Sequence, residues 1–414
     1  MNQTKMKRYL ITLIALSTAV IGCTKSGLVE SPQKYQAPIT FETYTGKTPE
    51  TKASEVTTVT LTSHQSASNP ALHVNAFLVS SPQSYASTYM SKDLWCKSVT
   101  YDDPDTDNSE FAATWTYSGA TYWPDNGSLL FVAYGLNAEK TITAGASSYN
   151  TITWDNTLKH SKFTYRVPAK ASEQEDLIVA VPQTQGISNN TASNVLLNFK
   201  HMLSKVGFSL KTDATNVVDI TIKSIKLNGS FYSYGVVDLT TTMNYGTESK
   251  TDMRPYVDVP TTQVPDVTSY SLFDAAYQNS EGTYDCFQIH RSPGNTATPI
   301  YANTTLSISN SSDVDDVYTD FDEDDEEASV LNRYMMLIPS TQSNATIEVV
   351  YELEGAKEKT ATASLGNSFS FEAGKAYEFV IKMNTSSIEF EAGVSGWDDT
   401  TVTGESIILK PVIL

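Results

Sequence analysis

Residues 121–135 read TYWPDNGSLLFVAYG, and this stretch decides the fold class. Asn126 and Gly127 form a pair that tolerates positive φ, which is typical of a tight turn. The residues after the turn alternate along one face of a strand: Leu130, Val132 and Tyr134. The stretch therefore predicts a hairpin in the core of a β-sheet, with Tyr122 and Trp123 packed into it.

Short strand-like runs of the same kind recur along the chain and are separated by turn signals rather than by helical patterns. These runs are 39–44, 56–61, 74–79, 128–134, 177–181, 206–210, 220–227, 345–352 and 377–383. The region 244–284 has no regular period and is predicted to form loops. Tyr (23) and Phe (15) are plentiful, which favours strands. We predict an all-β protein built from β-sandwiches.

The length of 414 residues predicts two or three domains. The polar stretch PQTQGISNNTASN, residues 182–194, is the best candidate for a boundary. The predicted division is a signal peptide (1–22), a flexible tether (23–36), an N-terminal β-sandwich (37–190) and a C-terminal β-sandwich (191–414) with long loops and an apolar terminal strand.

The first 23 residues have the pattern of a secretory signal that ends in a bacterial lipobox. A basic start is followed by an apolar run from Tyr9 to Ile21, which is too short to span a membrane, and then by Gly22 and Cys23. We predict that a diacylglyceryl group and further acyl chains such as palmitate are attached to Cys23. No other cofactor is predicted. The alternative is a signal peptide cut elsewhere, with Cys23 incidental.

The chain is acidic, with 28 Lys and Arg against 47 Asp and Glu and a net charge of −19. Loss of the signal peptide removes Lys5, Lys7 and Arg8 and makes the remainder more acidic still. Such a surface repels nucleic acid and anionic lipid, so nucleic acid is not a predicted partner. The acyl chains, not a basic patch, would hold the protein at a membrane.

Two cysteines remain after Cys23, namely Cys96 and Cys286. They could form a disulfide in an oxidising compartment, or stay two separate buried thiols, and the second interpretation is favoured.

Motifs that carry catalysis or bind metals are scarce. The acidic run 313–327 begins like a calcium loop at Asp320, but Asp325 stands where the loop needs glycine. A solvated acidic loop is therefore favoured, and no metal site is predicted. The five histidines show no ligand-like spacing: His64, His73, His160, His201 and His290. We predict that the chain is not an enzyme and that His201, beside Met202 and Leu203, is a core or interface histidine.

Several phrases, taken together and in order, resemble the fimbrillin family, the subunits of type V pili and related surface lipoproteins. They are the lipobox at Cys23, ITFETYTGKTPETKA (39–53), TYWPDNGSLLFVAYG (121–135), DLIVA (176–180), LNFKHMLSKVGFSLK (197–211) and FEAGKAYEFVIKMNTSSIEFEAGVSGWDD (371–399). Together they cover nearly the whole chain after the signal peptide.

The resemblance implies two transthyretin-like β-sandwich domains in tandem and assembly by strand exchange. A lipidated precursor would reach the surface of the outer membrane, a trypsin-like protease would remove the first strand, and the exposed groove would accept a strand from a neighbour. The implied location is the cell outer membrane or the fimbrium. The implied partners are other fimbrillin subunits or a second copy, the membrane through the lipid, and a host protein or glycan.

Lys52 and Ala53 occupy the place where the family carries an Arg-Ala cleavage site. No arginine lies between Cys23 and Ala53, so cleavage at Lys47 or Lys52 would need a protease that accepts lysine. The alternative is an exposed loop that is never processed.

The apolar tail SIILKPVIL, residues 406–414, is the second feature that the resemblance explains. Its candidate donor residues are Ile407, Ile408, Leu409, Val412, Ile413 and Leu414. Continuous apolar runs are typical of a strand covered on both faces. The tail is either a donor strand for a neighbour or the last strand of its own domain.

The alternative function is a stand-alone surface lipoprotein that binds glycans or host ligands. Trp95, Trp115 and Trp154 could form an aromatic platform for a sugar if they were exposed on one flat face. Burial of these residues would favour the assembly function.

Overall fold

The computed structural model divides the chain into two units, Met1–Ala37 and Pro38–Leu414, and nearly every described residue belongs to the second. The described residues are 37–44, 61, 65–79, 88–101, 110–125, 127–136, 152–154, 161–169, 171, 174–186, 194–212, 220–244, 253–259, 263–274, 287–289, 298–300, 334–353, 357–383, 388–396 and 407–409. Apart from Leu61 and Ala171, whose backbone is helical, the regular structure in these ranges is β-strand, which confirms the all-β class. None of the described residues belongs to a helix long and apolar enough to cross a membrane.

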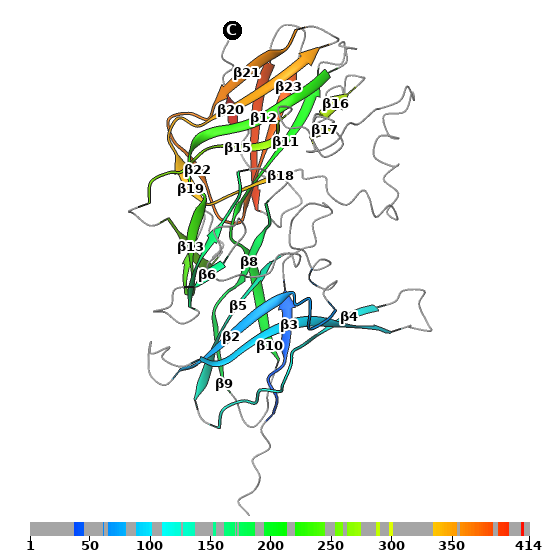
Figure 1. Ribbon diagram of the computed structural model, residues 1–414, viewed down its shortest axis with the longest axis vertical. Coiled ribbons are helices and arrows are strands. Elements are labelled where there is room, and N and C mark those ends of the chain that lie inside the picture. Colours follow the sequence, from blue (N-terminus) through cyan, green and yellow to red (C-terminus); the bar gives the residue numbers. More distant parts are fainter. Residues whose placement is uncertain are drawn as a thin grey trace, which may run out of the picture. The chain divides into compact units, whose positions relative to one another are not determined.

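The largest sheet has the strand order β1-β10-β8-β5-β2-β3-β4, with β9 also paired to β5 (Figure 1). Its strands are β1 (Phe41–Tyr44), β2 (Leu72–Val79), β3 (Thr88–Tyr101), β4 (Glu110–Thr116), β5 (Ser128–Leu136), β8 (Leu177–Ala180), β9 (Gln183–Gly186) and β10 (Val195–His201). All neighbours are antiparallel except β1 and β10, which are parallel. The first strand therefore lies at an edge of the sheet.

The turn and strand predicted from residues 121–135 are present, but the predicted hairpin is wrong. Gly127 has φ +90°, as the turn requires, and β5 follows it. However, β5 pairs with β2 on one side and with β8 and β9 on the other. The segment before the turn instead makes a bridge from Tyr122 to Pro38. Pro124 has no backbone N–H, so this segment is poorly suited to a ladder with β5.

A four-stranded sheet has the order β14-β13-β7-β6. Its strands are β6 (Ile152–Trp154), β7 (Lys162–Arg166), β13 (Tyr234–Asn244) and β14 (Met253–Asp258). The prediction of loops over 244–284 is wrong for β14 and for β15 (Val267–Asp274). Tyr270 and Leu272 are buried on one face of β15, but this alternation is too short to be told from loop sequence without its partner strand.

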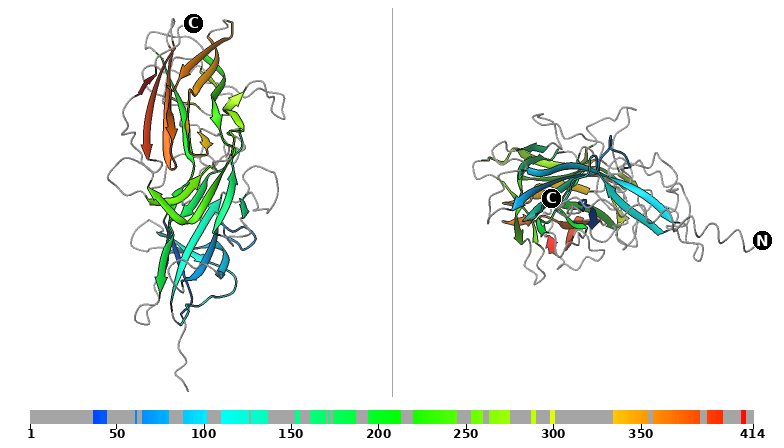
Figure 2. Two further views of the ribbon diagram at one scale, coloured as in Figure 1. Left: turned by 90° about the vertical axis from the view of Figure 1, so that its left-hand side faces the viewer. Right: turned by 90° about the horizontal axis from the view of Figure 1, so that it is seen from below.

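The remaining sheets pack face to face as two layers (Figure 2). The six-stranded layer contains β11 (Ser204–Thr212), β17 (Thr298–Pro299), β18 (Tyr334–Leu337), β23 (Lys375–Met383), β24 (Ile388–Gly396) and β25 (Ile407–Leu409). The other layer is a five-stranded sheet of β12 (Ile220–Phe231), β15, β16 (Phe287–Ile289), β20 (Thr346–Leu353) and β21 (Lys359–Ser364). A separate two-stranded sheet is formed by β19 (Ser340–Gln342) and β22 (Phe369–Phe371). Leu227 and Ile347 from one layer share a core with Phe208 and Phe379 from the other. This is the packing of a β-sandwich.

Strands from both sides of the predicted boundary at residues 190 and 191 pair with each other. β10 follows the boundary in sequence and pairs with β1 and β8, and β13 pairs with β7. The division into two domains, and their transthyretin-like character, stay predictions.

Candidate assembly site

Several residues predicted to serve assembly lie outside the described part of the chain. They are Cys23, Lys52, Ala53, Val412, Ile413 and Leu414, together with Cys286 of the proposed cysteine pair. Two of the predicted features are described: the first strand, β1, and the backbone of β25, which contains Ile407, Ile408 and Leu409. Cys96 is a buried free thiol.

Ile39 and Thr40, which lead into β1, form backbone hydrogen bonds with two different parts of the chain. The Val195 N–H of β10 donates to the Thr40 carbonyl at 2.8 Å, and the Ile39 N–H donates to the Thr121 carbonyl at 2.8 Å. The Tyr117 hydroxyl also donates to the Ile39 carbonyl at 2.7 Å. Release of β1 would leave these donors and acceptors unpaired.

The predicted alternation is confirmed for residues 39–42, whereas the side chain of Tyr44 lies outside what the structure describes. Ile39 and Phe41 are 1% and 4% exposed, whereas Thr40 and Glu42 are exposed. The period of two in an extended chain places alternate side chains on opposite faces. Burial of two large apolar side chains stabilises the docked strand by about 1.5 to 3 kcal/mol each.

Aromatic rings surround Phe41. Its ring meets the edges of Tyr117 and Phe131, each with centroids 5.9 Å apart, and Trp123 meets Phe131 at 5.7 Å. Such edge-to-face pairs contribute about 0.5 to 1.5 kcal/mol beyond the burial of area. Phe41 is therefore the main anchor of β1.

Polar side chains on either side of β1 add further contacts. The Trp115 indole N–H donates to the Thr43 hydroxyl at 2.8 Å, and Trp115 is 5% exposed. On the exposed side, Asn194 accepts from the Thr40 hydroxyl at 2.5 Å and donates to the Glu42 carboxylate. We name the residues that receive β1, namely Trp115, Tyr117, Thr121, Phe131 and Val195, the β1 seat. Sequence reasoning missed this role, because Trp115 was considered only as part of a sugar platform.

The described part of the apolar tail, residues 407–409, pairs with one strand. β25 pairs antiparallel with β24 through Ile407 opposite Ala392, Ile408 opposite Glu391 and Leu409 opposite Phe390. It ends the strand order of the six-stranded sheet. The described tail thus pairs by three residues with its own sheet, and its service to a neighbour stays a prediction.

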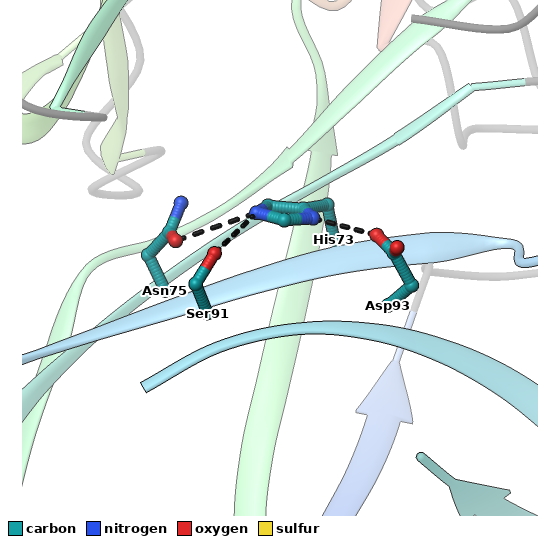
Figure 3. A network of polar contacts seen from close by, with 4 residues as sticks. All are labelled: His73, Asn75, Ser91 and Asp93. Carbon is teal, nitrogen blue, oxygen red and sulfur yellow. Dashed lines mark hydrogen bonds and ion pairs between the residues drawn. The ribbon is translucent and has the colours of Figure 1, made fainter. Parts of the chain in front are cut away.

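A second polar cluster joins β2 and β3 (Figure 3). The His73 Nδ1 lies 2.7 Å from the Asp93 carboxylate, and its Nε2 lies 3.2 Å from the Ser91 hydroxyl and 3.3 Å from the Asn75 Oδ1. His73 stands opposite Asp93, and Asn75 opposite Ser91, in the antiparallel register. With the His73 ring neutral and its Nδ1–H donated to Asp93, Nε2 accepts a hydrogen bond from the Ser91 hydroxyl. With the ring protonated, Nε2–H instead donates to the Asn75 Oδ1.

This Ser–His–Asp order is the order of a nucleophilic triad, but the groups come together here as directly opposed cross-strand pairs. Ser91 and Asp93 are exposed side chains of the sheet. Cross-strand pairs of this kind stabilise a sheet by about 0.2 to 1 kcal/mol each. The cluster is therefore explained by sheet pairing. Sequence reasoning missed it because no residue spacing reveals the register of two strands.

The His73 hydrogen bond holds the pKa of Asp93 below its ordinary value, and the charge of the imidazole adds to this, against the opposing effect of burial. A lowered pKa stabilises the fold at pH above the ordinary value of about 4, and this contribution is lost as the pH falls through the lowered value. Because Asp93 is 59% exposed, the contribution stays below about 1 kcal/mol. In His73→Gln, carboxyl titration by NMR should show the pKa of Asp93 moved upward. An unchanged Asp93 titration would contradict this assignment.

His201 is buried, as the sequence predicts for a core histidine. It is 2% exposed, and its Nδ1 lies 2.7 Å from the Asp176 carboxylate. The nearby Gln174 accepts from the Met336 N–H at 2.5 Å and donates to the Pro168 carbonyl at 2.7 Å. This buried network ties the segment before β8 to β18.

Of the three tryptophans of the proposed sugar platform, the structure excludes Trp115 from an exposed face. Trp115 is buried in the β1 seat, Trp95 is half-buried, and the side chain of Trp154 lies outside what the structure describes. Within the described ranges, no cluster of three or more His, Cys, Asp or Glu side chains could hold a metal ion.

The described part of the chain is an all-β protein in which the first strand, β1, and the last described strand, β25, each lie at the edge of a sheet. The sequence profile of the fimbrillin-like family matches residues 89–397, and the chain belongs to this family.

The chain is similar in fold to a fimbrial protein from Bacteroides vulgatus, with a TM-score of 0.50 and 15% identity over 87% of this chain and 99% of that one. A fimbrial assembly protein from Parabacteroides distasonis matches with a TM-score of 0.39 and 11% identity over 90% and 98% of the two chains. The tip fimbrial protein Mfa3 from Porphyromonas gingivalis, truncated at its C-terminus, matches with a TM-score of 0.33 and 10% identity over 80% of this chain and 94% of that one. A comparison with curated proteins gives no match.

Proposed function

We propose that the chain is a structural and adhesive subunit of a bacterial cell-surface fimbria and not an enzyme. It is exported as a lipoprotein through Cys23 and assembles by strand exchange after proteolysis removes β1. Its partners are other fimbrial subunits or further copies of itself. Its location is the outer membrane surface or the fimbrium.

The observation that carries this proposal is the docking of β1. The strand lies at a sheet edge, is anchored by Ile39 and Phe41, and is followed by a segment that contains Lys47 and Lys52. A sheet that loses such a strand exposes unpaired N–H and C=O groups together with an apolar groove. A strand from a neighbour satisfies both.

Cleavage between β1 and β2 is expected to start assembly. The mature chain should give a ladder of oligomers on SDS gels after a lysine-specific protease cuts at Lys47 or Lys52, because the vacated groove can then take a second strand. A chain with Lys47→Gln and Lys52→Gln is the matched control and should stay monomeric. A cleaved chain that remains monomeric would speak against exchange and for a stand-alone adhesin.

Lipid attachment is tested separately at Cys23. Cys23→Ser removes the thiol that would carry the lipid, so the protein should move from the membrane fraction to the soluble fraction and lose incorporation of labelled fatty acid. Cys96→Ser serves as the control and should keep both properties. Unchanged membrane partition of Cys23→Ser would remove the lipoprotein part of the proposal.

A further inference from the structure

β21 ends the strand order of the five-stranded sheet, so it has a paired side and an open side (Figure 1). It pairs with β20 in one unbroken antiparallel register, from Thr346 opposite Ser364 to Tyr351 opposite Lys359. Among the described strands, none pairs with its other side. Sheet edges are commonly protected by proline, by a bulge or by several charges, whereas β21, with the sequence KTATAS, carries one lysine at its start. β21 is therefore a regular edge to which another strand can be added.

The backbone groups on the open side of β21 belong to residues with hydroxyl side chains. The Leu365 N–H donates to the Ala345 carbonyl of the segment before β20 at 2.8 Å, so the backbone of Leu365 faces that side. Successive residues of a strand direct their N–H and C=O groups to opposite sides, so every second residue before Leu365 also faces β20. The residues whose backbone faces the open side are Thr360, Thr362 and Ser364.

The side chains of β21 leave this edge accessible. Ala361 and Ala363 face the core of the sandwich, and Ala363 is 0% exposed. Thr360 and Ser364 lie on the opposite face of the strand and are exposed. Because all of these side chains are short, the backbone of a second strand can approach the edge closely.

The charges beside β21 are balanced, although the chain as a whole is acidic and two copies repel each other at long range. The Lys223 Nζ of β12 lies 2.5 Å from the Glu352 carboxylate and 3.4 Å from the Glu358 carboxylate. Lys357 and Lys359 are exposed next to Glu358 in sequence. The edge itself therefore carries no excess of negative charge.

We propose that β21 pairs antiparallel with the β21 of a second copy of this chain, about a two-fold axis beside Thr362. Thr362 then lies opposite Thr362 of the second copy, and Thr360 lies opposite Ser364 of the second copy. All outward-facing residues of both strands exchange N–H···O=C hydrogen bonds, and the two five-stranded sheets become one continuous sheet. The same patch serves both copies, as in the isologous interface of a two-fold dimer.

Other registers satisfy fewer of these backbone groups. A shift by one residue places outward-facing residues opposite residues that face β20. A shift by two residues brings Glu358 or Gly366 into the ladder, and neither belongs to β21; Gly366 also has φ +90°. In the proposed register Ala361 lies opposite Ala363 of the second copy, and hydroxyl side chains lie opposite hydroxyl side chains, which is a favourable cross-strand pair.

The pairing of two such short strands is weak in isolation, because stable complexes bury about 1,200 to 2,000 Å². A weak contact becomes effective where many copies are held in one array, since each pairing raises the effective concentration for the next. In fimbriae it would join neighbouring fibres side by side. That consequence rests on the proposed function, whereas the pairing itself does not.

The test uses the uncut mature chain with Cys23→Ser, so that neither lipid nor cleavage contributes. Sedimentation at roughly 0.01 to 1 mM protein should show a reversible equilibrium of monomer and dimer. Thr362→Pro removes an outward N–H from both copies but no hydrogen bond to β20, so it should raise the dissociation constant about 5- to 100-fold. Thr362→Val keeps the N–H and is the matched control, expected to pair like the parent chain. A chain that stays monomeric over this range, or a dimer that Thr362→Pro leaves equally stable, would overturn the proposal.

A charge exchange tests the register without proline. Thr360→Lys with Ser364→Lys sets like charges opposite each other in the pair, and Thr360→Glu with Ser364→Glu does the same with negative charges. Each double variant alone should be monomeric, and an equal mixture of the two should form a heterodimer. A mixture that does not associate would overturn the register. Because both measurements use the uncut chain, their failure would leave assembly after cleavage untouched, and a failed oligomer ladder would leave the pairing of β21 untouched.

Discussion

Replacing Phe41 with alanine is expected to loosen β1 more than any other single change in that strand. Phe→Ala truncations in a core cost about 3 to 5 kcal/mol, and Phe41 is 4% exposed between Tyr117 and Phe131. Because β1 is an edge strand, the loss should appear as local opening rather than as unfolding of the whole chain. Amide hydrogen exchange at Val195 in β10 should become about a hundred- to several-thousandfold faster.

Leu196→Ala is the matched control for Phe41→Ala. Leu196 also belongs to the β1–β10 pair, opposite Glu42, but its side chain is 49% exposed. Surface truncations of this kind change stability by only about 0.5 kcal/mol, so exchange at β10 should stay near that of the wild type. If Phe41→Ala behaved like Leu196→Ala, Phe41 would not be the anchor of β1.

Deleting residues 406–414 is expected to abolish oligomer formation after cleavage while leaving the monomer folded. Within the described part of the tail, β25 pairs with three residues of β24, and two of these, Phe390 and Ala392, belong to the core shared with the other layer. We therefore expect the sandwich to stay folded without the tail. The measurement is the oligomer ladder of the cut chain, with thermal unfolding to follow the fold.

The control for this deletion replaces Ile408 alone with serine. If the tail acts as a donor strand, its other apolar residues remain for the groove of a neighbour, and the ladder should persist at reduced yield. A deleted chain that fails to fold would instead show that the tail completes its own domain, the other interpretation of its apolar sequence.

Local features of β1 could be predicted from the sequence, whereas its surroundings could not. Alternation over residues 39–44 is visible in the sequence because an extended chain turns every second side chain to the same face. The contact between Thr43 and Trp115 joins residues 72 positions apart, and the parallel pairing with β10 joins residues about 150 positions apart. Register between distant strands is set by packing of the whole sheet, which no single segment encodes.

The same limit explains the other differences between sequence and structure. The turn at Gly127 is local chemistry and was predictable, but the partner of β5 proved to be β2 rather than the segment before the turn. His73 and Asp93 become neighbours only through the register of β2 and β3. In β15, apolar and polar residues alternate over only a few positions, which is too short a pattern to distinguish a strand from a loop.

The central claim is that β1 leaves and that the tail of a neighbour takes its place. The most direct measurement is amide hydrogen exchange of β10, read by mass spectrometry, on oligomers purified from the cut chain. The account predicts that the β1 segment is absent from these oligomers and that the Val195 amide is protected again, as it is in the uncut chain where it bonds to Thr40. Oligomers that retain the β1 segment, or that leave β10 unprotected, would contradict it.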